Sequence, residues 1–187
     1  GNDDEYVDSI TRACYDIFYA EHVKFRDYQG RLMSPPALSV TGHFRLGVRC
    51  GATPNGRKAR IPFTDASVSA SPGMDKNGPT ALIRSATRVI DTVKYAAAQI
   101  NMKFHPTSLS SREGLRKLLT LVKTYLDLGG HHIQFNVVST ETLRDAQCHP
   151  EKYRDLIVRI AGFSAYFIHL DHMVQNEIIK RTEIGFN

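Results

Sequence analysis

The chain has 187 residues, of which 42% are hydrophobic and 23% charged, a composition that suits a globular protein and excludes an intrinsically disordered one. Its formal net charge of +5 has one tight basic cluster (Arg57, Lys58 and Arg60) and no RNP-type strand or helix-turn-helix pattern beside it, so it does not indicate a nucleic-acid partner. No apolar run approaches the ~20 residues that cross a bilayer, and the acidic start, Gly1–Glu5, is unlike a signal peptide, so we expect a cytoplasmic protein without membrane contact.

The cysteines and histidines do not form a metal-binding pattern. The three cysteines, Cys14, Cys50 and Cys148, are an odd number and lie far apart, so they give neither a disulfide framework nor a CxxC pair. His131 and His132 are adjacent, and on a strand adjacent side chains point to opposite faces. We expect no metal site built by this chain.

The first part of the chain predicts a helix followed by a long irregular segment. A helix capped by Asn2 or Asp3 is expected to run to roughly Gln29, because apolar residues recur there at helical spacing. Cys14 belongs to this apolar stripe and is expected in the core. The segment Gly51–Pro79 is dense in Gly, Pro, Ser, Asn and Asp, and a loop of that length is usually functional or packed against another part of the protein.

Helices and strands alternate along the rest of the chain. Ser110-Ser111-Arg112-Glu113 is a capping box, and the helix that it opens is expected to stop at Gly129-Gly130. We expect strands near 38–41, 100–104 and 133–137, and helices that begin near 80, 111, 139, 150 and 171. This alternation predicts an α/β fold with a largely parallel sheet.

The strand expected at 133–137 has the pattern of a half-buried strand. Its apolar residues, Ile133, Phe135 and Val137, alternate with Gln134 and Asn136. Such alternation is typical of a strand whose apolar face packs on the core.

A strand-like run near the end of the chain, VRIAGFSAYF, has one glycine at its centre. This run is Val158–Phe167, and the glycine is Gly162. Glycine weakens a strand interior because it has no side chain to pack and loses much backbone freedom on folding. The local pattern therefore indicates a bulge, a tight bend or a close backbone approach.

Several segments together resemble the glycyl radical enzymes. Arg159, Ile160, Ala161, Gly162 and Phe163 match the family's order of arginine, hydrophobic residue, small residue, radical glycine and aromatic residue. Further matching segments, in the family's order, are GATPNGRKA (51–59), DKNGPTA (75–81), NMKFHP (101–106), GGHHIQFNVV (129–138), HPEKYRDLIVR (149–159) and VQNEIIKRTE (174–183). The chain resembles the branch of glycerol and diol dehydratases and choline trimethylamine-lyase more than pyruvate formate-lyase itself.

The resemblance implies a fold and a domain division. Residues 1–128 would form the C-terminal part of the family's ten-stranded α/β barrel, of pyruvate formate-lyase type. Residues 129–187 would form the glycyl radical domain. Gly129-Gly130 is expected to cap the preceding helix, and a further hypothesis makes this pair a hinge that lets the domain swing out.

The resemblance also implies the site. Gly162 would store a radical that a radical S-adenosylmethionine activating enzyme installs after translation, with no cofactor bound. A radical at Cα is stabilised when the amide nitrogen donates to it and the carbonyl withdraws from it, and a side chain would crowd that planar centre. The radical-site motif would be Arg159, Ile160, Ala161, Phe163 and Ser164. Phe163, Tyr166, Ile160 and Phe167 are expected to exclude water and oxygen.

In the family, a cysteine followed by an acidic step carries the radical to substrate, and no cysteine here fits that pattern. Cys14 precedes Tyr-Asp, Cys50 precedes Gly-Ala, and Cys148 precedes His-Pro. We therefore expect the catalytic cysteine on a larger chain or an N-terminal portion outside this sequence. The other expected partners are a small-molecule substrate and the activating enzyme, in an assembly expected to be oligomeric.

The implied function is the radical-storing portion of an anaerobic glycyl radical lyase, in the cytoplasm or in a bacterial microcompartment. We favour dehydratase-type elimination on a small hydroxylated substrate. A carbon–carbon lyase, a decarboxylase and a fumarate-adding enzyme stay open. So does a spare part or structural subunit that repairs or scaffolds a partner enzyme. Whether the chain is a natural small subunit or a piece of a longer enzyme is also left open.

Overall fold

The computed structural model describes residues 1–186 and has the predicted α/β organisation. Its helices are α1 (Glu5–His22), α2 (Gly42–Arg49), α3 (Gly78–Val89), α4 (Arg112–Asp127), α5 (Thr140–Cys148) and α6 (His172–Lys180), with short 3-10 turns η1 (Pro106–Leu109), η2 (Pro150–Lys152) and η3 (Phe167–His169). Its strands are β1 (Pro36–Ala37), β2 (Ala97–Phe104), β3 (His132–Val137), β4 (Ile157–Arg159), β5 (Ser164–Tyr166) and β6 (Glu183–Ile184). Within residues 1–186, no helix combines the length and the apolar character that crossing a membrane requires.

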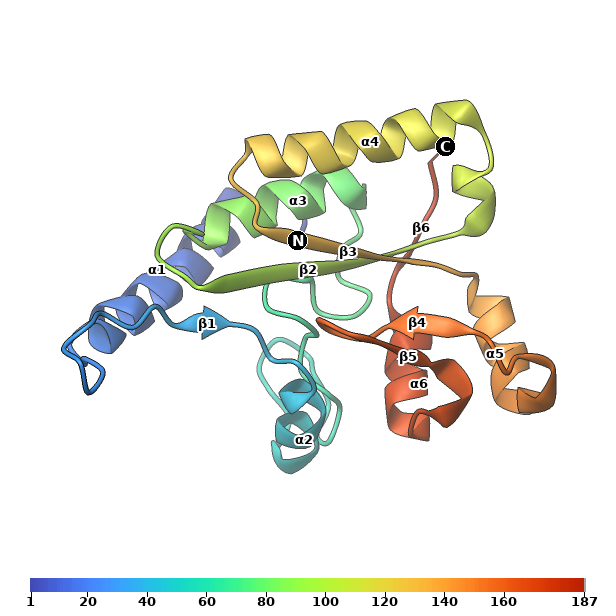
Figure 1. Ribbon diagram of the computed structural model, residues 1–187, viewed down its shortest axis with the longest axis horizontal. Coiled ribbons are helices and arrows are strands. Elements are labelled where there is room, and N and C mark those ends of the chain that lie inside the picture. The colour runs from blue at the N-terminus through green and yellow to red at the C-terminus, as the bar shows by residue number, and fades with distance from the viewer. Residues whose placement is uncertain (187) are drawn as a thin grey trace.

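Strand β2 is the centre of a four-stranded parallel sheet (Figure 1). β3 runs beside it through six residue pairs, from Gln99–His132 to Phe104–Val137. β1 pairs with the start of β2, and β6 pairs with its end on the edge opposite β3. α3 and α4 lie over one face of β2 and β3, whereas α2, α6 and the β4–β5 hairpin lie beyond the other face.

The protein has two hydrophobic clusters, one on each side of this sheet. The first joins α3 and α4 to the apolar side chains of β2, which are Ala98, Ile100, Met102 and Phe104. The second joins α5, the β4–β5 hairpin and α6 around Leu143, Phe167 and Ile178, each 0% exposed. The segment that follows β3 therefore has an apolar core largely of its own.

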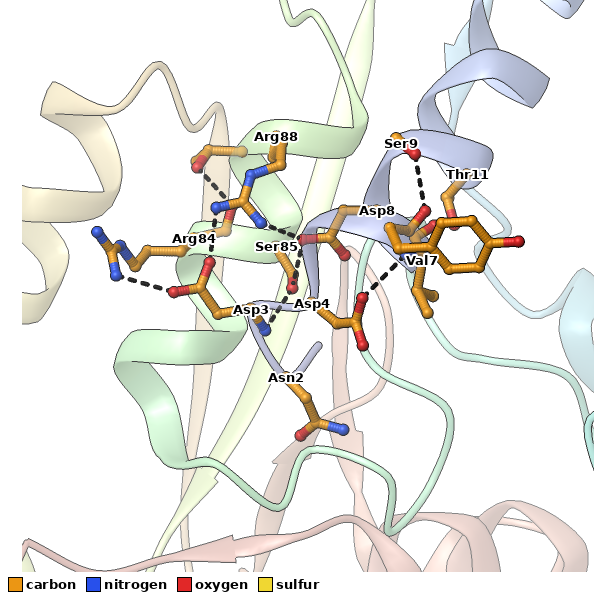
Figure 2. A network of polar contacts seen from close by, with 12 residues as sticks. Asn2, Asp3, Asp4, Val7, Asp8, Ser9, Thr11, Arg84, Ser85 and Arg88 are labelled. Atoms are coloured by element: carbon orange, nitrogen blue, oxygen red, sulfur yellow. Dashed lines mark hydrogen bonds and ion pairs between the residues drawn. The ribbon is translucent and has the colours of Figure 1, made fainter.

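Helix α1 is anchored to α3 by charged side chains. Figure 2 shows Asp3 and Asp8 reaching one guanidinium, that of Arg88, which donates to Asp3 Oδ1 and to Asp8 Oδ2 at 2.6 Å each. Arg84 donates to the other oxygen of Asp3 (2.8 Å), and the Ser85 hydroxyl donates to Asp8 (2.9 Å). The hydrogen bond from Arg88 lowers the pKa of Asp3, and the same bond raises the pKa of Arg88.

This anchoring turns the predicted apolar stripe of α1 away from the core. Cys14, predicted to be buried, is exposed. The apolar residues Val7, Ile10, Ile17 and Phe18 are each more than half exposed. Helical spacing predicts the helix, but Asp8, which is 3% exposed, selects the face that packs.

Element boundaries in the first third also differ from the predictions. α1 ends at His22 and not near Gln29, and its N-cap is Asp4, whose carboxylate accepts the N–H of the helix's third residue. The strand expected at 38–41 is two residues long and lies at 36–37. α2 forms in a segment where no helix is predicted. Its two glycines weaken the helical pattern in the sequence, and in the structure its N-cap residue makes no side-chain hydrogen bond.

Helix α4 ends at Gly129-Gly130, as the pattern predicts, in a Schellman motif. The Gly130 N–H donates to Tyr125 O (2.8 Å) and the Gly129 N–H donates to Leu126 O (2.9 Å). Gly129 has φ +88°, and a Cβ on Gly130 would overlap with the Tyr125 ring. The C-cap is confirmed, and the hinge stays a prediction.

Substituting these glycines should destabilise the fold. Gly130→Ala is expected to lower the free energy of unfolding by about 1–3 kcal/mol, because its Cβ meets a packed ring. Gly129→Ala is expected to lower it by about 1–2 kcal/mol, because its φ is left-handed. The matched control is Gly51→Ala, whose Cβ would meet no atom within 4 Å and should cost under about 0.5 kcal/mol. Urea denaturation measures all three, and equal costs would contradict this account.

Candidate functional site

Gly162 lies in the turn of the β4–β5 hairpin. The two strands run antiparallel, and the Ile160 N–H donates to Phe163 O (3.0 Å), which leaves Ala161 and Gly162 as the two turn residues. Gly162 has φ +85°, a conformation that glycine adopts without the penalty other residues incur. Of the three local readings of this glycine, a bulge, a tight bend or a close backbone approach, the tight bend is the one observed.

Side-chain amides from β2 and β3 hold the backbone of this turn. Asn136 Oδ1 accepts the Arg159 N–H (2.8 Å), and Asn136 Nδ2 donates to Arg159 O (2.9 Å). Asn101 Nδ2 donates to Ile160 O (2.8 Å), and Gln134 Oε1 accepts the N–H of the turn glycine (3.3 Å). These amides provide the hydrogen bonds that a neighbouring strand would otherwise give to the same backbone groups.

The four amide side chains share one face because of strand geometry and register. Alternate residues of a strand point the same way, so Gln99 and Asn101 face away from the first cluster. The parallel register sets Asn101 beside Gln134, and Asn136 two residues farther along β3. We call Gln99, Asn101, Gln134 and Asn136 the amide row; each is at most 7% exposed.

The amide row reverses the burial expected on β3. Gln134 and Asn136 are each 4% exposed, whereas Val137, expected on the buried face, is 50% exposed. Apolar alternation predicts the strand, but the hairpin that covers its polar face comes much later in the chain. A usable signal was the run of amides at alternate positions on two neighbouring strands.

A buried guanidinium also holds the turn, at the same carbonyl oxygens that accept from Asn101 and Asn136. Arg181, which follows α6, donates from Nη1 to Arg159 O (3.1 Å) and from Nη2 to Ile160 O (2.9 Å). Glu177 accepts from Nε (3.0 Å) and Nη2 (2.9 Å) of Arg181, and Asp65 Oδ2 lies 3.3 Å from Nη2. Burial raises the pKa of Glu177 against the opposing charge of the guanidinium. Burial lowers the pKa of Arg181, but the two carboxylates outweigh it and the net shift is upward.

Sequence reasoning missed this charged cluster. Glu177 and Arg181 are spaced i, i+4, the helical spacing of ion pairs, and this signal was available. Asp65 comes from the long irregular segment, so its approach could not be read from local pattern. The segment expected to be functional or buried is thus in part a wall of this site.

Lys103 is the next residue after Asn101 on the same face of β2, and it links α5 and α6 to the sheet. Its Nζ donates to Thr140 Oγ1 (2.9 Å) and Ile179 O (3.0 Å), and lies 3.8 Å from Glu183 Oε2. Burial lowers the pKa of Lys103, and the charge of Glu183 opposes that shift.

One group of possible metal ligands occurs among residues 1–186. His105, Glu141 and Glu183 bring ligand atoms within 4.8 Å of one another. Lys103 already stands beside Glu183, whose Oε2 also accepts from Thr140 N and Oγ1 at 2.7 Å each. Because the Glu183 carboxylate already has these partners, its charge and hydrogen-bonding capacity are satisfied without a metal ion.

The predicted radical-site motif is divided between the interior and the surface. Ile160 and Ala161 are buried, Gly162 and Ser164 are exposed, and Arg159 Nη1 donates to the Ser164 hydroxyl across the hairpin (3.0 Å). Phe163 is 40% exposed. The motif thus presents its glycine at the surface of the described chain.

The aromatic and aliphatic residues predicted to exclude water and oxygen are likewise divided. Ile160 and Phe167 lie in the second hydrophobic cluster, whereas Tyr166 is 46% exposed. Cys14 and Cys148 are exposed and Cys50 is half-buried. The described chain alone therefore does not cover the glycine.

A family model for the glycine radical matches residues 64–168, more than half of the chain. The chain therefore belongs to the glycyl radical enzymes, as its motifs predict. The match crosses the boundary predicted at 128/129, and that boundary stays a prediction.

Curated relatives include several lyases. The chain is 46% identical over 183 residues to the 4-hydroxyphenylacetate decarboxylase glycyl radical subunit of Clostridium scatologenes, covering 98% of this chain and 20% of the relative. It is 44% identical over 183 residues to indoleacetate decarboxylase of Tractidigestivibacter scatoligenes, covering 98% and 21%. It is 39% identical over 186 residues to trans-4-hydroxy-L-proline dehydratase of Clostridioides difficile, covering 100% and 23%. The chain thus spans about a fifth of the length of these relatives.

Solved structures confirm the predicted fold class. The B12-independent glycerol dehydratase from Clostridium butyricum, solved with glycerol bound, aligns with a TM-score of 0.95 at 40% identity, over 100% of this chain and 24% of that chain. Hydroxyproline dehydratase from Clostridioides difficile aligns with a TM-score of 0.95 at 39% identity, over 100% of this chain and 23% of that chain. The chain has the fold of the corresponding part of these α/β-barrel enzymes.

Removing the buried guanidinium should destabilise the protein strongly. Arg181→Met leaves Glu177 and Asp65 buried without their cation, and breaking a buried pair in this way costs about 3–5 kcal/mol. The control is Arg31→Met, which breaks an exposed pair with Asp27 and should cost under about 1 kcal/mol. Urea denaturation measures both free energies of unfolding, and similar losses in Arg181→Met and Arg31→Met would contradict a stabilising role for the buried Arg181.

Stability should also fall in mild acid because of His43 on α2. His43 is 2% exposed, and its burial lowers its pKa from 6.5 to about 4, with Asp65 opposing the shift and Arg181 adding to it. Above pH 6.5 the histidine is neutral in both states and has no pH effect. As pH falls from 6.5 to 4, His43 binds a proton in the unfolded state but stays neutral in the folded state. This difference lowers the free energy of unfolding by about 3 kcal/mol. His43→Gln should lose this part of the pH dependence, and an unchanged profile would contradict it.

Proposed function

We propose that this chain is the radical-storing portion of a glycyl radical lyase, with the radical at Gly162. The observation that carries the proposal is the setting of this glycine within a family-matched motif. Its Cα has no side chain, its N–H is bonded to Gln134, and the two preceding backbone units are clamped by amides and by Arg181.

The arrangement suits a backbone radical. The N–H of Gly162 is held by Gln134, and the two peptide units before it are held by Asn101, Asn136 and Arg181, so the peptide unit on the N-terminal side of the Cα is kept in one orientation. Any other residue would also meet a penalty here, because φ is +85°. Gly162 is at the surface of the described chain, so its cover must come from outside these residues.

The remaining parts of the reaction come from outside this chain. A radical S-adenosylmethionine activating enzyme removes a hydrogen atom from the Gly162 Cα. A cysteine on the larger part of the enzyme then gives its S–H hydrogen to that Cα, which regenerates glycine and leaves a thiyl radical. The thiyl radical then takes a hydrogen atom from the substrate. We also propose that this reaction takes place in the cytoplasm.

The bond that breaks in the substrate is a separate question. Dehydratase-type elimination on a small hydroxylated substrate is one candidate, and the two dehydratase structures aligned above support it. Decarboxylation is the second, supported by identities of 44% and 46% to two arylacetate decarboxylases, against 39% to a dehydratase.

Electron paramagnetic resonance tests the radical directly. Activated anaerobically and assembled with the cysteine-bearing part, the enzyme should show a doublet that collapses when the Gly162 α-positions carry deuterium. Gly162→Ala should fold with a loss of about 1–2 kcal/mol and give no doublet.

A matched variant separates the chemistry from the turn. Asparagine tolerates positive φ, so Gly162→Asn should keep the hairpin and lose both the signal and turnover. An active Asn variant would mean that glycine serves the turn alone. A silent wild-type spectrum under proven activating conditions would favour a structural or spare-part role.

A further inference from the structure

One atom of the amide row has no hydrogen-bond partner in the part of the chain that the structure describes. Gln99 is 1% exposed, and its Oε1 has no hydrogen-bond partner among residues 1–186. The same atom lies 3.6 Å from the point where a Cβ on Gly162 would sit. Apart from the glycine's own neighbours, no other heavy atom of the described chain comes within 4 Å of that point.

Neighbouring side chains fix the direction of this amide. Asn101 Nδ2 is committed to Asp65 Oδ2 (2.6 Å) and to Ile160 O (2.8 Å). Asn101 Oδ1 must then face the other way, where it accepts from Gln99 Nε2 (2.9 Å). Gln99 Oε1 is therefore directed at the glycine by a relay that starts at the Asp65 carboxylate.

A fixed, buried and unpartnered carbonyl oxygen is costly. Leaving such an acceptor unsatisfied costs about 1–3 kcal/mol, and a flipped amide would only create a worse mismatch at Asn101. An acceptor held at this cost fits a donor that arrives from outside the described chain. The open space in front of the Gly162 Cα is where that donor would enter.

We propose that Gln99 is a positioning residue whose Oε1 accepts a hydrogen bond from the thiol that exchanges a hydrogen atom with Gly162. This inference rests on the function proposed above. A thiol is a weak S–H donor with a rotatable hydrogen, so a strong carbonyl acceptor beside the Cα can hold the sulfur near it. Rotation about the Cβ–S bond then turns the hydrogen from Oε1 to the Cα.

The step balances with no further reactant. The S–H bond breaks homolytically and a Cα–H bond forms, so the unpaired electron moves from carbon to sulfur. Gln99 is unchanged, because it aligns the sulfur and takes no proton. In the reverse step, the thiyl radical takes hydrogen back from the same Cα.

Hydrogen exchange at the stored radical isolates this role. In D2O the thiol carries deuterium, and repeated transfer should convert the glycyl doublet of the full enzyme to a singlet. Gln99→Leu should slow this conversion at least tenfold while the total spin stays within twofold of wild type. Gln99→Glu should stay within threefold of the wild-type rate, because a buried, protonated carboxyl can donate to Asn101 and still present a carbonyl oxygen to Gly162. The control is Gln147→Leu, which removes an α5 amide bonded to Gln175 and Asn176 of α6 and should exchange as wild type does.

Each outcome decides the proposal. Slow exchange with full spin in Gln99→Leu, restored in Gln99→Glu, supports it. Exchange at the wild-type rate in Gln99→Leu overturns it, as does a wild-type enzyme that holds the doublet unchanged in D2O. Should Gln99→Leu store no radical, Gln99→Met is the second variant, and a spin loss there too would make Gln99 a support of the turn only. A wild-type enzyme without any doublet would instead refute the proposed function.

Discussion

The hydrogen bonding of the hairpin residues Arg159, Ile160 and Gly162 is the constraint on which this structure depends. These residues form the end of a short hairpin that packs against the face of a sheet, so their inward polar groups have no strand of the described chain beside them. Side-chain amides of β2 and β3, together with the guanidinium of Arg181, take that place. The parallel register of β2 and β3 sets the spacing of those amides, so the position of the glycine is set by the sheet.

Hydrogen bonds such as those between the amide row and the β4–β5 hairpin fix one geometry, yet they can be broken at a modest cost in free energy. Exchanging a protein hydrogen bond for one with water changes the free energy by only about 0.5–1.5 kcal/mol, whereas separating apolar surfaces exposes them to water at a cost that grows with area. The second hydrophobic cluster lies largely within the segment after β3, so that segment could leave the amide row without losing its own core. A hinge at Gly130 would in addition require β3 to give up its six pairs with β2.

Features encoded within a few residues were predictable. The bend at Gly162 and the stop of α4 at Gly129 follow from local chemistry, and the order of motifs was enough to identify the family. The cap of α4 falls on Ser111, one residue later than the expected capping box of Ser110 and Glu113, and Ser111 accepts the Gly114 N–H. Features that join distant segments were not. The inward face of α1 depends on Arg88, and the burial of Gln134 depends on a hairpin far along the chain, so hydrophobic periodicity alone misassigned both.

The two explanations of Gly162 are complementary. A left-handed φ is reason enough for glycine in a two-residue turn, so the turn alone would not indicate a radical. The turn does, however, decide which way the missing side chain would have pointed. That direction leads to Gln99 Oε1 and otherwise to space that no atom of the described chain occupies within 4 Å. A turn without this arrangement would also accept glycine, but it would hold the Cα against its neighbours. Here the same backbone geometry that requires glycine also leaves one face of its α-carbon open to a sulfur atom.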